Sequence, residues 1–174
     1  MTITSEQLIK IMPTARTRVG IYLRFINEYA EKFGITTNLR MAHFLSQVAH
    51  ESCELRYTQE LASGKAYEGR KDLGNTHVGD GVRFKGRGLI QITGRANYEA
   101  YRLFCGYDVV SHPGLLEKPL GAVKSAMWYW QTHGLNSLAD LDNIEKVTKR
   151  INGGYNGLES RRKYLNRAKV ALST

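Results

Sequence analysis

The stretch NLRMAHFLSQVAHESCELRYTQE, residues 38–60, determines where the helix that begins near residue 38 ends and which acidic side chains can meet. Met41, Leu45 and Val48 recur at the three- and four-residue spacing of one helix face. The pattern predicts an amphipathic helix with that face buried. Asn38 is the residue expected to cap its start.

Three glutamates, Glu51, Glu54 and Glu60, follow this apolar face. In an unbroken helix, the nine residues from Glu51 to Glu60 correspond to about 900° of rotation and about 13.5 Å of rise, which points the two side chains to opposite sides. Glu54 would then be the neighbour of Glu51. If the helix instead ends near residues 53–56, the chain can fold back and present Glu60. The sequence leaves both pairings open.

Glu51 is a candidate for acid chemistry because it lies beside the apolar face, where a carboxyl can be partly buried. Partial burial favours the protonated carboxyl, which is the form that a general acid needs. The preceding His50 also suggests a zinc protease motif, but that motif requires a second histidine where Glu54 stands. The sequence predicts neither a metal site nor a cofactor.

The rest of the chain is typical of helices interrupted by one glycine-rich segment. Apolar stripes predict helices over residues 19–33, 120–133, 143–151 and 159–172, and Thr4 and Gln7 can form a capping box. Residues 64–94 hold eight of the 17 glycines, and such a segment is uncommon in a compact domain unless it is functional. The predicted fold class is mainly α with a partly extended excursion. The absence of a linker or repeat in the sequence predicts one domain over residues 1–174.

Within the glycine-rich segment, LIQIT at residues 89–93 predicts a short strand. Alternation along a strand puts Gln91 and Thr93 on the same face. Together with Asn97 they could line a polar cleft. An exposed polar strand face explains the same pattern equally well.

Two further pairs of residues have plain structural interpretations. Cys53 and Cys105 are the only cysteines, and we expect them to be buried free thiols. Trp128 and Trp130 stand at helical spacing among apolar residues, so we expect core packing rather than sugar stacking.

Charge restricts the partner more than it restricts the activity. The chain carries 25 Lys and Arg against 16 Asp and Glu, a net charge of +9 with a pI near 9.6. This balance favours an anionic partner, such as nucleic acid, an acidic membrane surface or an acidic wall polymer. The sequence shows neither a secretory signal nor an apolar run of about 20 residues, which predicts a protein made in the cytoplasm.

Three segments taken together resemble one enzyme family. They are FLSQVAHES, YEGRKDLGNTHVGDGVRFKGRGLIQITGRANY and RINGGYNG, and the resemblance runs from about residue 41 to residue 162. The chain resembles glycoside hydrolase family 19, the chitinase-like enzymes, and in particular the phage or prophage endolysin branch. The resemblance implies a lysozyme-like α+β fold with a small β excursion beside the catalytic cleft. It also implies inverting hydrolysis of a β-1,4 bond between N-acetylated aminosugars.

The resemblance assigns roles residue by residue. It implies that Glu51 is the general acid, Glu60 the general base and Thr93 the residue that holds the attacking water. The implied substrate-binding residues are His50, Gln91, Asn97, Tyr98, Asn152 and Arg161. Plant members of the family carry the base further downstream, so Glu60 follows the shorter branch. They also carry an acidic residue where this chain has Asn156.

The resulting hypothesis is a peptidoglycan hydrolase that lyses bacteria as a monomer, without a metal or a cofactor. We expect it to be made in the host bacterial cytoplasm, to reach the wall after release by another factor, and not to bind nucleic acid. The basic C-terminal helix could contact an anionic membrane surface, although a solvated face is the simpler interpretation. A chitinase acting on N-acetylglucosamine polymers is the alternative enzyme. A non-catalytic protein that binds wall polymer or nucleic acid is the alternative of another class.

Overall fold

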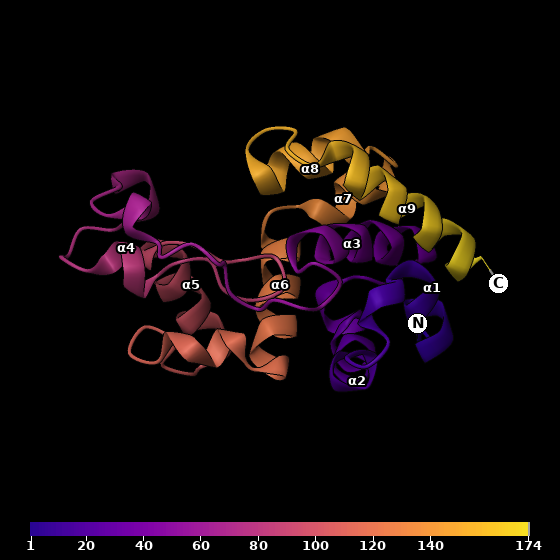
Figure 1. Cartoon of the computed structure of the whole chain (residues 1–174), viewed down its shortest axis with the longest axis horizontal. Helices are drawn as coiled ribbons and strands as arrows, with labels where there is room; N and C mark the ends of the chain where they lie inside the picture. The colour runs from indigo at the N-terminus through magenta and orange to yellow at the C-terminus, as the bar shows by residue number, and fades with distance from the viewer. Residues whose placement is uncertain (174) are drawn as a thin grey trace. The chain divides into compact units, whose positions relative to one another are not determined.

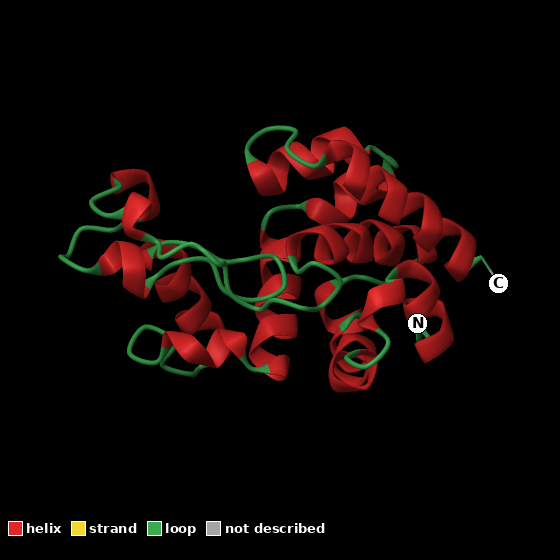
Figure 2. Ribbon diagram, in the orientation of Figure 1, coloured by secondary structure: helices red, strands yellow, loops and turns green. Residues whose placement is uncertain are grey.

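The computed structural model describes residues 1–173, and these are mainly helical (Figure 1, Figure 2). The chain divides into two compact units. The first unit joins Met1–Arg56 to the segment that begins at Met127, and the second is the continuous stretch Tyr57–Ala126. The predicted mainly α fold is confirmed, while the single catalytic domain stays a prediction.

In the first unit, α3 (Asn38–Glu51) is a long helix whose apolar face is fully buried. Met41, Leu45 and Val48 are each 0% exposed, which confirms the stripe predicted from their spacing. α9 (Leu158–Leu172) packs along α3 (Figure 1). The other helices of this unit are α1 (Ser5–Ile11), α2 (Val19–Tyr29), α7 (Leu135–Asp140), α8 (Ile144–Asn152) and the later part of α6 (Pro119–Thr132), with 3-10 turns at Pro13–Ala15 and Glu31–Phe33.

The predicted capping box at the start of α1 is confirmed. Thr4 Oγ1 accepts the Gln7 N–H at 3.1 Å, and the Gln7 side chain accepts the Thr4 N–H at 2.9 Å. The cap predicted for α3 is wrong, because the hydroxyl of Thr37 caps that helix. Asn38 instead donates its side-chain amide to the carbonyl of Leu172 at 2.7 Å, so it ties the start of α3 to the end of α9.

The burial predicted for the tryptophans is confirmed, and the burial predicted for the cysteines is wrong. Trp130 is fully buried and meets Phe44 edge to face, with ring centroids 5.4 Å apart, and Trp128 is also buried, which confirms core packing. The cysteines are free thiols, but the predicted burial is wrong. Cys53 is exposed, and Cys105 is half-buried at the end of its helix.

α3 ends at Glu51, so the alternative of an unbroken helix over residues 38–60 does not hold. The next residues, Cys53, Glu54 and Leu55, all have left-handed backbone conformations, with φ of 48°, 58° and 66°. Each non-glycine residue in this region costs about 1–2 kcal/mol. A run of three must therefore be held in place by its surroundings.

The second unit is built from short elements. They are α4 (Asp80–Arg83), α5 (Arg95–Cys105), the first part of α6, and 3-10 helices at Lys65–Tyr67, Lys71–Leu73 and Pro113–Glu117. The strand predicted at residues 89–93 is wrong. Gln91 has a φ of 63°, and the segment is a turn closed by an isolated bridge between Arg87 and Ile92. A second isolated bridge joins Arg87 to Gln59. Within the described residues there is no β-strand pairing beyond these isolated bridges.

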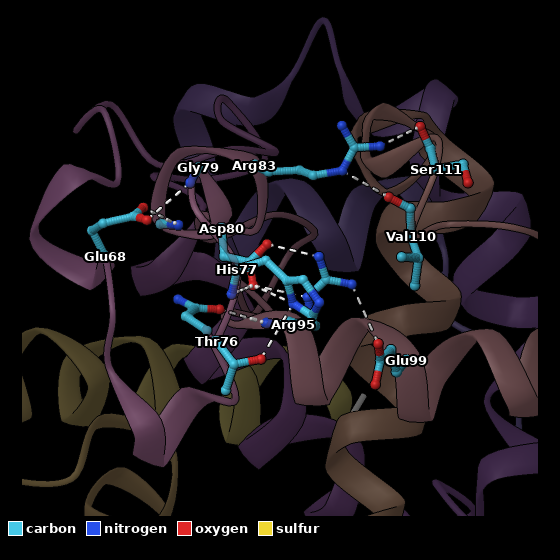
Figure 3. A network of polar contacts seen from close by, with 12 residues as sticks. Glu68, Thr76, His77, Gly79, Asp80, Arg83, Arg95, Glu99, Val110 and Ser111 are labelled. Atoms are coloured by element: carbon cyan, nitrogen blue, oxygen red, sulfur yellow. Dashed lines mark hydrogen bonds and ion pairs between the residues drawn. The ribbon is translucent and has the colours of Figure 1, made fainter.

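A polar network gives the glycine-rich segment its fixed shape (Figure 3). Asp80 is 1% exposed, and Arg95 donates to both of its carboxylate oxygens at 2.8 Å. The Glu68 carboxylate accepts the backbone N–H groups of Gly79 and Gly81, each at 2.9 Å. Paired charges and backbone amides thus hold the loops of this segment against the short helices α4 and α5.

Candidate active site

Glu51, the last residue of α3, is paired with Arg161 of α9. Nη2 of Arg161 lies 2.6 Å from Oε1 of Glu51, and the two side chains are 1% and 18% exposed. Arg161 also donates to Oε1 of Gln47 at 2.5 Å and to the carbonyl of Asn156 at 3.2 Å. Glu51 is thus partly buried, and a guanidinium with three acceptors fixes its carboxylate.

His50, next to Glu51, packs against the loop that precedes α9. Its Nδ1 lies 3.0 Å from the Ser160 hydroxyl. A Cβ on Gly157 would lie 3.0 Å from Nδ1 and closer still to Cε1 and Nε2, so only glycine leaves room for the ring. Burial, followed by the positive charge of Arg161, lowers the pKa of His50. The ring is therefore neutral at neutral pH.

Asn152, the last residue of α8, shapes the loop between α8 and α9. Its side-chain oxygen accepts the N–H of Asn156 at 3.3 Å, and Asn156 in turn gives its carbonyl to Arg161. Asn156 therefore holds Arg161 through its backbone oxygen. The site residues predicted in the first unit all contact this loop or a residue that it holds. They are His50, Glu51, Asn152 and Arg161.

Tyr129 of α6 is a neighbour of Glu51 that the sequence did not reveal. Burial raises the pKa of Tyr129, and the negative charge of Glu51 raises it further. Its ring stacks on His133 with centroids 3.8 Å apart, and its hydroxyl lies 3.4 Å from the Arg150 carbonyl. In the sequence it is one of three successive aromatic residues, and nothing in that pattern separates it from its core neighbours.

In the second unit, the two carboxylate oxygens of Glu60 have different surroundings. Oε2 accepts the hydroxyl of Tyr67 at 2.9 Å. Oε1 is buried and has no hydrogen-bond partner among residues 1–173. The Glu60 N–H donates to the Gly86 carbonyl at 2.9 Å, which fixes the residue on its loop. One oxygen of the carboxylate is thus held by a hydrogen bond, and the other has no partner within the described residues.

Tyr67 is itself fixed by Asn75, which is 1% exposed. The Asn75 amide donates to the Tyr67 carbonyl at 2.9 Å, and its oxygen accepts the Arg95 N–H at 2.8 Å. Because Arg95 also holds Asp80, the network of Figure 3 extends to the partner of Glu60. Sequence reasoning missed both Tyr67 and Asn75.

Gln91 lies beside Glu60 because a glycine separates them. A Cβ on Gly86 would lie 3.0 Å from Oε2 of Glu60 and 3.3 Å from Oε1 of Gln91. The left-handed turn, rather than a strand, presents the Gln91 amide here. The strand alternation that put Gln91 and Thr93 on one face is wrong, and the turn instead brings the Gln91 amide close to Glu60.

Thr93 and Asn97 continue from Gln91 as a chain of hydrogen bonds. The Thr93 hydroxyl donates to the Gln91 carbonyl at 3.1 Å, and the Asn97 amide donates to the Thr93 carbonyl at 2.8 Å. Since the Thr93 hydroxyl hydrogen is used in this bond, its oxygen is oriented to accept a hydrogen bond from another group.

Tyr98 differs from the other predicted residues because it is fully buried. Its hydroxyl donates to the Lys85 carbonyl at 2.6 Å and accepts from Arg87 at 3.1 Å. Burial raises the pKa of Tyr98 to about 12. The predicted direct contact with substrate is at odds with this burial, and Tyr98 supports the loop that carries Gly86.

Glu54, the alternative partner for Glu51, is 7% exposed, and its carboxylate is occupied. Oε2 accepts the Thr14 N–H at 2.6 Å and also the Thr14 hydroxyl, and Oε1 accepts the Tyr164 hydroxyl at 2.8 Å. Although burial acts to raise it, these hydrogen bonds hold the pKa of Glu54 below its usual value. The occupied carboxylate favours Glu60 over Glu54 as the second reacting group.

Two kinds of feature are not found in the described part of the chain. Over residues 1–173, no helix is both long and apolar enough to cross a membrane. In the same residues, no three His, Cys, Asp or Glu side chains are grouped so that they could hold a metal ion.

A mainly helical fold with one partly buried, arginine-paired glutamate at a helix end, and a second glutamate whose Oε1 has no hydrogen-bond partner among residues 1–173, fits a lysozyme-like glycoside hydrolase. Comparison with known proteins specifies the class further. The model of the family described as chitinase class I matches residues 29–144. A Haemophilus influenzae protein described as a glycosyl hydrolase family 19 domain-containing protein is 34% identical over 192 aligned positions, covering 92% of each chain. The chain therefore belongs to glycoside hydrolase family 19.

Further relatives and solved structures support the same fold. An endochitinase of Arabidopsis thaliana is 34% identical over 123 positions, which cover 70% of this chain but 41% of the plant protein. A bacterial family 19 chitinase superposes with a TM-score of 0.80 over 100% of this chain and 96% of its own, at 20% identity. Chitinase C of Streptomyces griseus gives 0.79 over 99% and 77%, at 21% identity. The lysozyme-like fold is confirmed, and the phage endolysin branch stays a prediction.

Proposed function

We propose that this hydrolase cleaves β-1,4 bonds between the N-acetylated aminosugars of bacterial peptidoglycan, with inversion at the anomeric carbon. The proposal is supported by the different surroundings of the two carboxylate oxygens of Glu60. Oε2 accepts a hydrogen bond from Tyr67, and Oε1 has no partner among residues 1–173. A base of an inverting glycosidase must take a proton from water, and Oε1 is the oxygen suited to do so.

In the proposed reaction, protonated Glu51 donates its proton to the glycosidic oxygen while the bond from that oxygen to the anomeric carbon breaks. Ionised Glu60 takes a proton from a water, which attacks the anomeric carbon from the opposite face of the sugar. Thr93 accepts the other hydrogen of this water, since its own hydroxyl donates to Gln91. Arg161 orients Glu51 and stabilises the carboxylate that proton transfer leaves behind.

Charge supports peptidoglycan as the substrate. The net charge of +9 attracts an anionic polymer over several ångströms, and bacterial walls carry carboxylates and phosphates. Chitin carries no such groups. Wall hydrolysis should therefore weaken as salt is added, because exposed charges are screened beyond about 10 Å at 0.1 M salt.

The proposed setting is the host bacterial cytoplasm, from which the monomer reaches the wall after release by another factor. Contact of α9 with anionic lipid would rest on the basic residues of this helix. Besides Arg161, two basic residues of α9 are engaged in ion pairs, Arg162 with Glu145 at 3.5 Å and Lys169 with Asp142 at 2.5 Å. The helix therefore presents less unpaired charge than its sequence indicates.

Chitin is the second candidate substrate, because the plant relatives carry the name endochitinase. Clearing of purified cell walls, compared with release of sugars from chitin oligomers, separates the two candidates. Mass analysis of the wall fragments then identifies the new reducing end, which distinguishes cleavage after muramic acid from cleavage after glucosamine.

The catalytic assignment is tested with Glu51→Gln, Glu60→Gln and Glu54→Gln in the wall-clearing assay, with folding checked by circular dichroism. Glu51→Gln and Glu60→Gln should lose at least about a thousandfold in rate, as expected when a required acid or base is removed. Glu159→Gln, on a side chain 87% exposed, is the matched surface control.

Two outcomes would refute the proposal. Full activity of Glu60→Gln would show that the base is another group. An undiminished biological effect of Glu51→Gln, together with wall binding that weakens steeply with salt, would identify a non-catalytic binding protein instead.

A further inference from the structure

The left-handed turn at Cys53, Glu54 and Leu55 directly follows Glu51, yet the proposed reaction does not use it. Glycine is the residue that adopts positive φ readily, and this turn contains none. Three successive residues in this conformation persist only where other contacts hold them. Whatever holds the turn also holds the end of α3.

Backbone hydrogen bonds wind the turn onto the last turn of α3. The Glu54 N–H donates to the Ala49 carbonyl at 2.9 Å, and the Arg56 N–H donates to the Ser52 carbonyl at 2.9 Å. The Ser52 hydroxyl accepts the Leu55 N–H, also at 2.9 Å. These bonds place the turn but do not offset the unfavourable φ values, because a glycine turn would make them equally well.

The Glu54 side chain supplies the additional hold. Its carboxylate joins Thr14, from the 3-10 turn after α1, to Tyr164 of α9. Arg18 donates to the Glu54 carbonyl at 3.1 Å, so the backbone of Glu54 is held by a hydrogen bond as well. One nearly buried residue therefore ties together three segments that are far apart in the sequence.

α9 holds both glutamates in the same way. Glu51 and Glu54 are three residues apart, and so are their α9 partners, Arg161 and Tyr164. Residues three apart on a helix are neighbours on its surface. The salt bridge at Glu51 and the hydrogen bond at Glu54 are therefore adjacent cross-links between α9 and the end of α3.

We propose that Glu54 is a positioning residue for the general acid. Its carboxylate holds the strained turn against Thr14 and Tyr164, and the turn sets where α3 ends and how Glu51 meets Arg161. The inference rests on the proposed role of Glu51 as the acid. Glu54 itself neither touches the sugar nor moves a proton.

A comparison of Glu54→Ala with Glu54→Gly separates turn geometry from charge. Both variants lack the carboxylate, but only glycine adopts the left-handed conformation without strain. If Glu54 acts by holding the turn, kcat should fall in Glu54→Ala and be at least about fivefold higher in Glu54→Gly. KM should stay within about twofold of the wild type in both. Glu159→Ala, on the exposed face of α9, is the control expected to keep wild-type activity.

Tyr164→Phe removes one cross-link and keeps the carboxylate, so it tests the proposal even if the Glu54 variants fold poorly. It should lower kcat, as Glu54→Ala does, but by a smaller factor. It should also shift the high-pH limb of the kcat profile, where the acid must stay protonated, to lower pH. Hydrogen exchange at the Glu54 and Leu55 amides should be fastest in Glu54→Ala and slower in Glu54→Gly. This readout is independent of catalysis.

The outcomes are distinguishable from failure of the proposed reaction. If wild type does not hydrolyse walls or chitin oligomers, or Glu51→Gln remains active, the proposed function fails, and hydrogen exchange still reports on the turn. Equal kcat in Glu54→Ala and Glu54→Gly would overturn the positioning role. So would loss of all activity in Glu54→Gln with full activity in Tyr164→Phe, because that pattern belongs to a reacting carboxylate.

Discussion

Replacing Gly157 with alanine would force a methyl group into the imidazole ring of His50. The new Cβ would lie 3.0 Å from Nδ1 and nearer to two other ring atoms, at a backbone φ of 73°. The left-handed conformation costs alanine about 1–2 kcal/mol, and overpacking adds about 1–3 kcal/mol. We expect the free energy of unfolding to fall by about 2–5 kcal/mol.

Gly153→Ala is the matched control at the other end of the same loop. Gly153 has a φ of 81°, and a Cβ there meets no atom within 4 Å. Only the conformational cost applies, about 1–2 kcal/mol. The difference between the two variants, about 1–3 kcal/mol, therefore measures the fit of His50 to Gly157.

Urea unfolding followed by circular dichroism gives both values, provided that the slope m is unchanged. Wall clearing at 25 °C should fall further in Gly157→Ala than in Gly153→Ala, because a displaced His50 disturbs the loop that holds Arg161. Equal destabilisation of the two variants, within about 0.5 kcal/mol, would refute the close fit of His50 against Gly157.

Three further variants test other parts of the site. Arg161→Met leaves Glu51 without its partner in a buried setting, so the free energy of unfolding should fall by about 3–5 kcal/mol, and unchanged thermal stability would contradict the ion pair. Tyr67→Phe frees Oε2 of Glu60 and should lower kcat by about tenfold to a hundredfold with little change in KM, whereas a pure KM effect would argue for a substrate contact. Hydrogen bonds from an arginine hold the pKa of Asp80 below 3.8, so this residue contributes stability above pH 3.8 that is lost as the pH falls through its folded value. The destabilisation by Asp80→Asn should therefore be large at pH 7 and shrink below pH 3.8, and a pH-independent difference in urea unfolding would exclude this linkage.

Helix positions and buried faces could be predicted because their signals are local. Met41, Leu45 and Val48 repeat within one helix, and their spacing alone indicates which side faces the core. The end of that helix could not be predicted in the same way. Glu54 has no intrinsic preference for the left-handed region, and its partners Thr14 and Tyr164 stand 40 and 110 residues away.

The candidate site shows the same limit. The resemblance supplied Glu60 and Gln91, but the alternation argument placed Gln91 on a strand, because periodicity does not register a single left-handed residue that closes a turn. Tyr67 and Asn75 could not be recognised, since neither residue type in a glycine-rich segment indicates a tyrosine that binds a carboxylate or an asparagine that holds this tyrosine.

The first unit is divided in the sequence by the second, and this order bears on how the enzyme is made. Residues 57–126 emerge from the ribosome as a continuous unit, while α3 waits for α9. At about 5–20 residues per second, the 110 positions from Glu54 to Tyr164 take about 5–20 s to translate. During that interval neither Arg161 nor Tyr164 exists, so the nascent chain carries its acidic residue without the partners that orient it. The contacts that join the end of α3 to α9 therefore form only after α9 has been synthesised, late in translation.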